Sequence, residues 1–344
     1  MNTLETIDLT TLDMVAGNTF LAERLTISEI VIGLLNGTLD LNLGNIFSWL
    51  MQSIFWETSQ LIYLFRYLII LAILSAIFKA VSSSFKTDSV HKLGFYASYI
   101  LVISVLFASL TLAVGIMSDM LHNIALLLQT ATPVIITLLA SGGYVASASA
   151  FAPIIIFIST FIATFIDRLL APTITFVAII HLLGYLFDKE KFETFSESAI
   201  KGIKFCIKSV TVIFIGIISI QRLATPVMNN VGIRGARFAV SAVPVVGSAL
   251  SNAMDTAIFY ARGLRSAVSA ALSIGAVLIT VVPIIQILAF IVMYKVTAIL
   301  VAPIADERIS KALMAMSDYA SLMLSICVII GFLFVFIVLA TLTI

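Results

Sequence analysis

Charged residues are scarce in this chain of 344 residues, where Asp, Glu, Lys and Arg together make up only 11%. Soluble domains carry about 25%. Hydrophobic residues reach 61% and the mean hydropathy is +1.17, so a water-soluble fold is excluded because it could not hide so much apolar surface. The formal net charge of +1 excludes the strongly basic class of nucleic-acid binders, and we expect no nucleic-acid partner.

Cysteine, histidine and catalytic motifs are also scarce. The two cysteines, Cys206 and Cys327, exclude a disulfide scaffold and a cysteine-rich metal site. The three histidines lie far apart at positions 91, 122 and 181, so no HExxH zinc motif occurs, and a P-loop is missing as well. The sequence therefore predicts a protein that is not an enzyme and has no metal or cofactor.

Long apolar runs are abundant, and many approach the 20 or so residues that a helix needs to cross a bilayer. The runs cover residues 61–81, 94–117, 124–140, 144–166, 169–187, 209–228, 279–296 and 320–343. They predict an all-α, polytopic integral membrane protein with about seven to nine transmembrane or re-entrant helices. We place this transmembrane domain at residues 61–344.

The first 60 residues form a less apolar, acidic segment whose one basic residue is Arg24. Apolar residues at helical spacing in 25–37 and 44–57 predict two short amphipathic helices at the membrane surface. The start lacks the basic and apolar pattern of a secretory signal. Either a signal precedes Met1, or the first span inserts the chain itself.

Lysine and arginine concentrate in three loops, near residues 79–92, 189–208 and 295–311. Because basic loops stay in the cytoplasm, we expect all three there, with the N-terminal segment and the C-terminus on the outer side. Five arginines between positions 222 and 265 conflict with this arrangement.

Proline spacing suggests an internal repeat. Pro133 and Pro244 lie 111 residues apart, and so do Pro172 and Pro283. A direct repeat with this offset predicts that residues 238–277 form a helical pair like 124–166. Coincidence is the alternative, because the chain has only seven prolines. Whether 229–277 crosses the membrane or re-enters it stays open.

Several polar residues stand in or beside apolar runs, where a charge needs a partner, water or a route to the surface. Asp255 is the only carboxylate between Glu197 and Asp306. It could form a structural ion pair with one of three arginines, or line a pore or groove. The arginines are Arg234, Arg237 and Arg262.

His181 has purely apolar helical neighbours. A buried, neutral, hydrogen-bonded histidine is therefore favoured over a proton carrier. The charged pair Asp167–Arg168 separates two apolar runs, and we expect it to cap a tight turn at the outer surface.

Ser141, Gly142 and Gly143 interrupt the apolar runs that surround them, and Pro133 lies just upstream. Broken helices mark transport sites in some carriers, which makes this stretch a candidate hinge. A tight hairpin between two spans is the alternative explanation.

An ordered set of segments resembles one family, stage III sporulation protein AE of endospore-forming bacteria. The set comprises PVIITLLASGGYVASASAFAPIIIF (133–157), GIISIQ (216–221), GIRGARF (232–238), PVVG (244–247) and IVMYKVTAILVAPI (291–304). Gln221, Arg234, Phe238, Pro244 and Asp255 are the polar or special positions within this order.

The resemblance implies a multi-pass subunit of a channel-like complex built across the two membranes around the forespore. It also implies partners, among them a cytosolic ATPase, small membrane proteins and ring-forming subunits, and a contribution to late forespore gene expression. The membrane expected from it is the mother-cell membrane that surrounds the forespore.

Two functions are therefore weighed. The first is a scaffold or conduit subunit, whose partners are the lipid bilayer and the other subunits of the complex. The second is a self-sufficient permease for a small solute, supported by the possible repeat, the glycine-rich break and Asp255. The first is favoured, mainly because of the resemblance.

Overall fold

The structure, a computed structural model, describes residues 27–36, 48, 51–52, 66–70, 73–77, 80–81, 88–141, 144–187, 190–241 and 247–342. These residues are helical except for Tyr144 and the turn at 302–306. The elements are α2 (Ile27–Asn36), α4 (Asp88–Ser141), α5 (Val145–Phe165), the π-helix η1 (Ile166–Leu170), α6 (Ala171–Phe187), α7 (Glu190–Ser241), α8 (Gly247–Val301) and α9 (Glu307–Leu342). The predicted all-α class is confirmed for this part of the chain.

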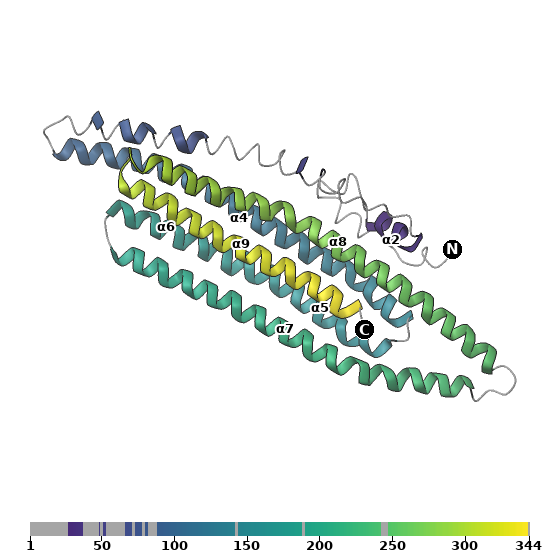
Figure 1. The fold of residues 1–344 in the computed structure, drawn as a ribbon. Coiled ribbons are helices and arrows are strands. Elements are labelled where there is room, and N and C mark those ends of the chain that lie inside the picture. The colour runs from purple at the N-terminus through teal and green to yellow at the C-terminus, as the bar shows by residue number, and fades with distance from the viewer. Residues whose placement is uncertain are drawn as a thin grey trace.

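The long helices run side by side in one elongated bundle (Figure 1). Five helical stretches in the described residues are long and apolar enough to cross a membrane. They are Tyr96–Ser141, Ala148–Phe187, Lys191–Ile220, Arg262–Val301 and Glu307–Ala340. A shorter apolar helix covers Arg66–Ile77. The chain is thus a membrane protein with multiple apolar spanning helices.

The predicted total of seven to nine spans is higher than these five because two pairs of predicted spans are continuous helices and because the run 61–81 is only partly described. The runs 94–117 and 124–140 both lie in α4. The residues that join them, 118–123, include neither Gly nor Pro, so nothing there ends a helix. The runs 144–166 and 169–187 are joined through η1, and Asp167–Arg168 lies inside that helix instead of capping a turn.

The helical pair predicted for residues 238–277 is not found in the described part of that stretch. Residues 247–301 form the single helix α8, with Pro283 inside it, whereas Pro172 lies at the start of α6. Membrane helices tolerate an internal proline. The order of the helices therefore does not show a direct repeat.

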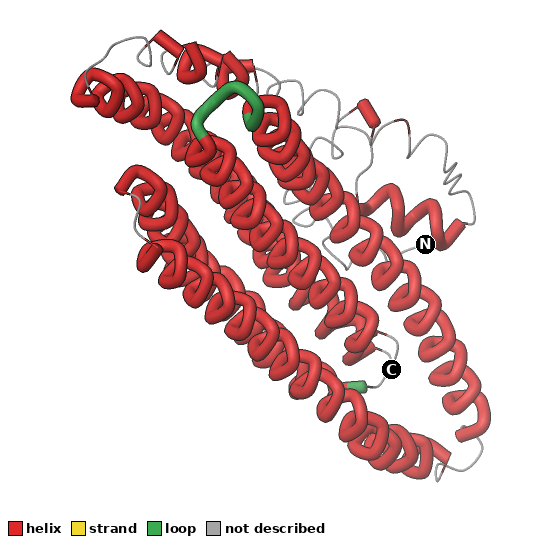
Figure 2. Tube along the Cα trace, turned by 60° about the vertical axis from the view of Figure 1, so that its left-hand side comes forward, coloured by secondary structure: helices red, strands yellow, loops and turns green. Residues whose placement is uncertain are grey.

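The fold brings parts of the three basic segments to one end of the bundle, whereas Lys204 and Lys208 of the second segment lie further along α7. The start of α4, the α6–α7 junction and the loop between α8 and α9 lie at this end (Figure 2). The α4–α5 turn and the C-terminal end of α9 lie toward the other end, and the α7–α8 hairpin projects beyond them (Figure 1). We call the first the basic end and the second the turn end.

Helix α9 occupies the centre of the bundle. Within its most apolar window, 56% of the residues are buried, compared with 22–39% for the other four spanning stretches. Its partner α8 is held in register by hydrogen bonds from Ser310 Oγ to the Ala298 carbonyl (3.2 Å) and from Ser317 Oγ to the Ile291 carbonyl (3.5 Å). Gly331 allows α9 to approach Thr280 of α8 closely.

Helix α2 packs against α8, with Ile30 and Val31 buried and Ile32 exposed. Its bounds confirm the helix predicted in residues 25–37. The second predicted helix, 44–57, lies mostly outside the described residues. Ser48, Met51 and Gln52 are helical and exposed within it.

Candidate functional site

The serine–glycine break forms the α4–α5 turn. Ser141 is the last residue of α4, and its hydroxyl donates to the Leu138 carbonyl at 3.1 Å. The Tyr144 amide donates to the Leu139 carbonyl at 2.8 Å, a contact that closes the helix end. Gly142 and Gly143 lie outside the described residues. These contacts match the hairpin alternative for this break.

Pro133 lies inside α4, two turns before this turn. The hydroxyl of Thr137 donates to the Pro133 carbonyl at 2.9 Å, so the helix continues past the proline. Because α4 is unbroken from Asp88 to Ser141, Pro133 does not divide it into two half-helices of the kind found at carrier binding sites.

A buried arginine lies beside the turn. Arg265 of α8 is 8% exposed, and its guanidinium carbon lies 4.9 Å from the ring centroid of Tyr144, a cation–π arrangement. Ser269, one turn further on the same face, is also buried. This face of α8 therefore carries polar groups into the bundle next to the α4–α5 turn.

Arg262 is the only one of the predicted site arginines whose side chain is described, and it is exposed. The positions of Gln221, Arg234 and Arg237 are in α7, and that of Asp255 is in α8. The side chains of these four lie outside the described part, as does Pro244. The proposed pairing of Asp255 with an arginine stays a prediction.

The contact between Arg265 and Tyr144 was missed in the sequence analysis. Arg265 was counted only among the arginines that conflict with the orientation, and Tyr144 was taken as the start of an apolar run. The two residues are 121 positions apart, and the only local signal was an arginine next to a run of small residues.

A histidine–tyrosine network lies nearer the basic end. His181 of α6 is 7% exposed. Its Nδ1 lies 3.1 Å from the hydroxyl of Tyr319 in α9, and its Nε2 lies 3.0 Å from the hydroxyl of Tyr185. The Tyr319 hydroxyl donates to the Val177 carbonyl at 3.3 Å.

This pattern suits a neutral imidazole. Because the Tyr319 hydroxyl uses its proton on Val177, it accepts a hydrogen bond from Nδ1, and Nε2 accepts one from Tyr185. Each ring nitrogen then has a hydrogen-bond partner while the imidazole carries no charge. The prediction of a buried, hydrogen-bonded histidine is confirmed in its geometry, and the network ties α6 to the central helix α9.

Two further tyrosines join α4 to its neighbours. The hydroxyls of Ser109 and Tyr294 share a buried hydrogen bond of 2.7 Å between α4 and α8. The Tyr99 hydroxyl donates to the Leu182 carbonyl of α6 at 2.9 Å. Buried hydroxyls need such partners, and here each one fixes the relative height of two helices.

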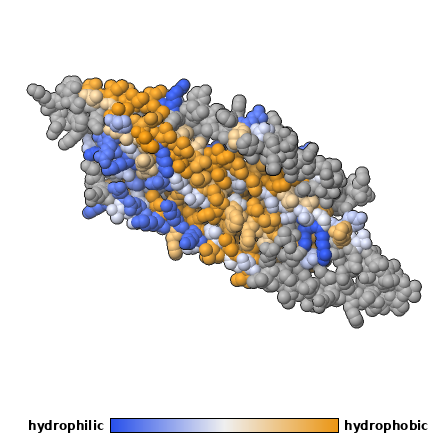
Figure 3. Space-filling view, viewed as in Figure 1, coloured by the Kyte–Doolittle hydropathy of each residue, from blue (hydrophilic) through white to orange (hydrophobic). Residues whose placement is uncertain are grey.

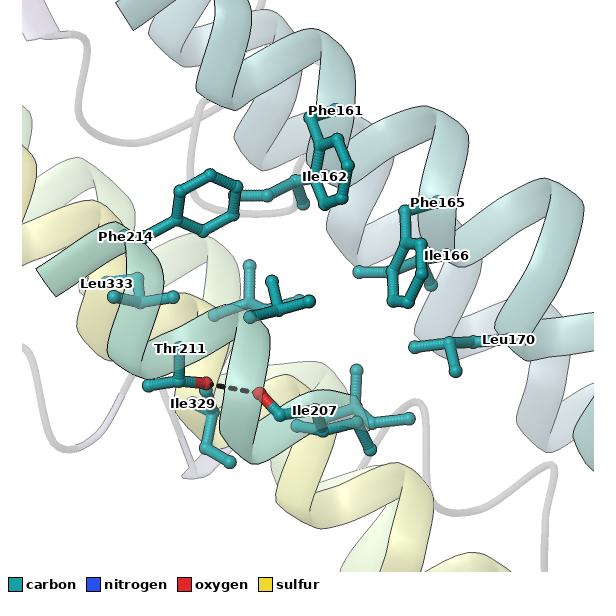
Figure 4. A pocket seen from close by; sticks show the side chains of 13 residues that line it. Phe161, Ile162, Phe165, Ile166, Leu170, Ile207, Thr211, Phe214, Ile329 and Leu333 are labelled. Atoms are coloured by element: carbon teal, nitrogen blue, oxygen red, sulfur yellow. Dashed lines mark hydrogen bonds between the residues drawn. The ribbon is translucent and has the colours of Figure 1, made fainter. Parts of the chain in front are cut away.

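A small apolar cavity lies between the end of α5, η1, α7 and α9 (Figure 4). Its volume is about 20 Å³, about one water-sized probe. Its one hydroxyl, that of Thr211, donates to the Ile207 carbonyl at 2.8 Å, and its other lining side chains are apolar. The cavity offers a solute neither room nor polar partners.

Metal-binding groups of three or more His, Cys, Asp or Glu are not found within the described ranges. The exposed thiol of Cys206 and the buried one of Cys327 are free. Several buried polar side chains in this part of the chain instead join one helix to another.

Two comparisons with known proteins point to the same family. The family model described as stage III sporulation protein AE matches residues 25–344. The protein named stage III sporulation protein AE of Bacillus subtilis (strain 168) is 25% identical over 239 residues, which are 69% of this chain and 60% of that protein. The chain thus matches about three fifths of the length of that relative. No solved structure matches it.

Proposed function

Since the chain belongs to the stage III sporulation protein AE family, we propose that it is a multi-pass subunit of the sporulation channel complex that links mother cell and forespore. In this role it acts as a scaffold or as part of the wall of a conduit, and it is needed for late forespore gene expression. Its partners are lipid and the other membrane subunits of that complex.

The main observation that supports this proposal is that side chains of α9 fill the centre of the described bundle. Helix α9 occupies the axis, with Met316, Met323, Ile326 and Phe334 each no more than 2% exposed. In the described part of the bundle the centre is filled, which favours a passage formed between this chain and its neighbours. A bundle that is packed in this way supports the subunit role over a self-sufficient permease.

We further propose the orientation that the basic loops suggest. The basic end lies in the cytoplasm, following the positive-inside rule, and the acidic segment 1–60 and the C-terminus lie on the outer side. The membrane is the mother-cell membrane around the forespore. The common location of the three basic segments (Figure 2) supports a shared side for them.

Purification from sporulating cells tests the proposed role. After chemical crosslinking, the full-length chain should co-purify with other membrane proteins of the stage III complex, and its amount should fall in strains that lack them. The same chain in liposomes should not move small solutes. Solute flux in liposomes together with normal levels in partner-deletion strains would favour the permease instead.

A further inference from the structure

The helices are too long for one bilayer. Helix α4 has 54 residues, which is about 81 Å at about 1.5 Å per residue. The hydrocarbon core of a bilayer is about 30 Å thick. The bundle must therefore extend well beyond the lipid, and the question is which part the lipid covers.

Exposed polar side chains interrupt three helices midway. Asp119 and His122 are exposed on α4, Asp167 and Arg168 on η1, and Lys204 and Lys208 on α7. We call these six residues the mid-bundle belt. Each lies far from the helix ends, where charged residues are usually found in a membrane protein.

The belt residues lie at the same height along the bundle. Helices α4 and α5 form a hairpin closed by the contact between Tyr144 and Leu139. Asp119 precedes Ser141 by 22 residues, and Asp167 follows Val145 by 22 residues, which brings the two carboxylates level. The cavity places Ile166 beside Ile207, and so brings Lys204 and Lys208 of α7 to that height.

Helices α8 and α9 also have polar side chains near the level of the belt. Ser109 meets Tyr294 across the antiparallel α4–α8 pair, so Asp119 lies close to the level of Gln286, which is partly exposed. Ile326 of α9 also lines the cavity. The neighbouring residue Ser325, which is exposed, therefore lies near the level of the belt. The belt therefore continues around the bundle with uncharged polar side chains.

A second polar boundary lies at the turn end. Phe259, Tyr260 and Arg262 are exposed on α8, and Tyr144 and Arg265 meet beside them. Aromatic and arginine side chains gather at membrane–water interfaces. From Asp119 to Ser141 there are 22 residues, about 33 Å of helix. This is close to the thickness of a bilayer core.

On α4, α5, α8 and α9 the segments between these boundaries contain no Asp, Glu, Lys or Arg, and on α7 the uncharged stretch ends before Arg222, which lies below the level of the α4–α5 turn. The uncharged stretches are residues 123–141, 145–166, 209–220, 266–283 and 326–342. Exposed side chains there include Ile156, Phe157, Val212, Val328 and Phe332. Lipid chains can contact such a surface without meeting a charge.

The half toward the basic end differs in charge. Glu193, Glu197 and Lys201 are exposed on α7, and Lys311 and Asp318 on α9. Figure 3 shows hydrophilic side chains gathered over the first part of α7, at the lower left, beside a hydrophobic surface. The charges of this half lie on α7, α8 and α9, whereas residues 94–118 of α4 and 169–187 of α6 contain none, and apolar side chains such as Phe176 are exposed there.

We propose that the bilayer surrounds only the half of the bundle between the mid-bundle belt and the turn end. The belt lies among the phospholipid headgroups, where its carboxylates and lysines stay hydrated. The half toward the basic end stands in the aqueous phase. Five of the described helices then cross the lipid, and the projecting ends of α7 and α8 leave it on the opposite side.

Thiol labelling on either side of Asp167 tests this placement. Phe157 and Phe176 lie on the same continuous helix and are 57% and 59% exposed. Each is changed to cysteine in a Cys206→Ser background, because Cys206 is exposed whereas Cys327 is buried. The purified full chain is placed in lipid nanodiscs, which are open on both faces, and treated with a water-soluble maleimide.

Phe176→Cys should react in nanodiscs at the rate found in detergent, whereas Phe157→Cys should react at least about tenfold more slowly, because the thiolate does not form in lipid. Met314→Cys and Phe332→Cys form a second pair on α9, 44% and 61% exposed, with the same expected order. Equal protection of both members of the pairs, or equal labelling of both, would overturn the placement.

Discussion

At the scale of single residues, polar side chains inside the bundle join helices that are distant in the sequence. His181 and Tyr319 are 138 positions apart, and Ser109 and Tyr294 are 185 apart. An apolar interior adapts to many helix registers, whereas a buried hydrogen bond is satisfied in only one. These contacts therefore select one arrangement of the helices.

The His181 network gives the first prediction. Tyr319→Phe removes the hydroxyl that bonds to His181 Nδ1 and to the Val177 carbonyl. Leaving buried groups without a partner should lower the free energy of unfolding by about 1–3 kcal/mol. Unfolding in mixed detergent micelles measures this, with Tyr260→Phe as the control because Tyr260 is 71% exposed. Equal stability of the two variants would contradict the network's role.

The pairing of Arg265 with Tyr144 gives the second prediction. In a double-mutant cycle with Arg265→Met and Tyr144→Leu, the coupling energy should be about 0.5–2 kcal/mol, because the guanidinium lies over the ring. Arg262→Met, on the exposed neighbour, should show no coupling to Tyr144→Leu. A cycle with zero coupling energy would mean that the ring does not stabilise the arginine.

At the scale of the elements, close packing of α6 on α7 depends on one glycine. A Cβ at Gly184 would lie 2.6 Å from Phe192 Cβ, a distance at which the helices must move apart. Phe192 lies in the first turn of α7, so this contact lies where α7 begins to pack against α6.

Gly184→Ala is therefore expected to lower the free energy of unfolding by about 1–3 kcal/mol, as overpacked cores do. Gly202→Ala is the matched control, because nothing lies within 4 Å of its Cβ position and alanine favours a helix by up to about 1 kcal/mol. Thermal unfolding in detergent compares the two. A stable Gly184→Ala protein would show that α6 and α7 are not in firm contact.

The sequence predicted the helical class and the places of several apolar runs, but not where helices end. The apolar runs 94–117 and 124–140 predict two separate spans, although no residue in 118–123 breaks a helix. The charged pair Asp167 and Arg168 between the next two runs predicts a turn. A polar interruption of an apolar run marks either a chain reversal or a helix leaving the lipid, and local sequence does not separate these two cases.

In the candidate site, too, local features could be predicted from the sequence and long-range contacts could not. The burial and bonding of His181 followed from its apolar neighbours, and the structure agrees. The contact of Arg265 with Tyr144 depends on how the α4–α5 turn meets α8, a long-range packing that no sequence spacing reports. Arg265 could be recognised as unusual, but its partner could not be identified.

At the scale of the whole molecule, the two important features are the filled axis and the length of the bundle. Among the described residues the axis is filled by α9, and α4 is more than twice as long as a bilayer core is thick. In our account lipid covers only the half between the mid-bundle belt and the turn end. The other half, with its exposed lysines and glutamates on α7, is then free to meet partner subunits in water.

The most direct test is cryo-electron microscopy of the purified full-length chain in a lipid nanodisc. The account predicts that the disc density encloses the bundle from the level of Asp119 and Asp167 to the α4–α5 turn, while the basic end stands clear of the disc. A disc centred on the level of Asp119, or one that encloses the basic end, would contradict it.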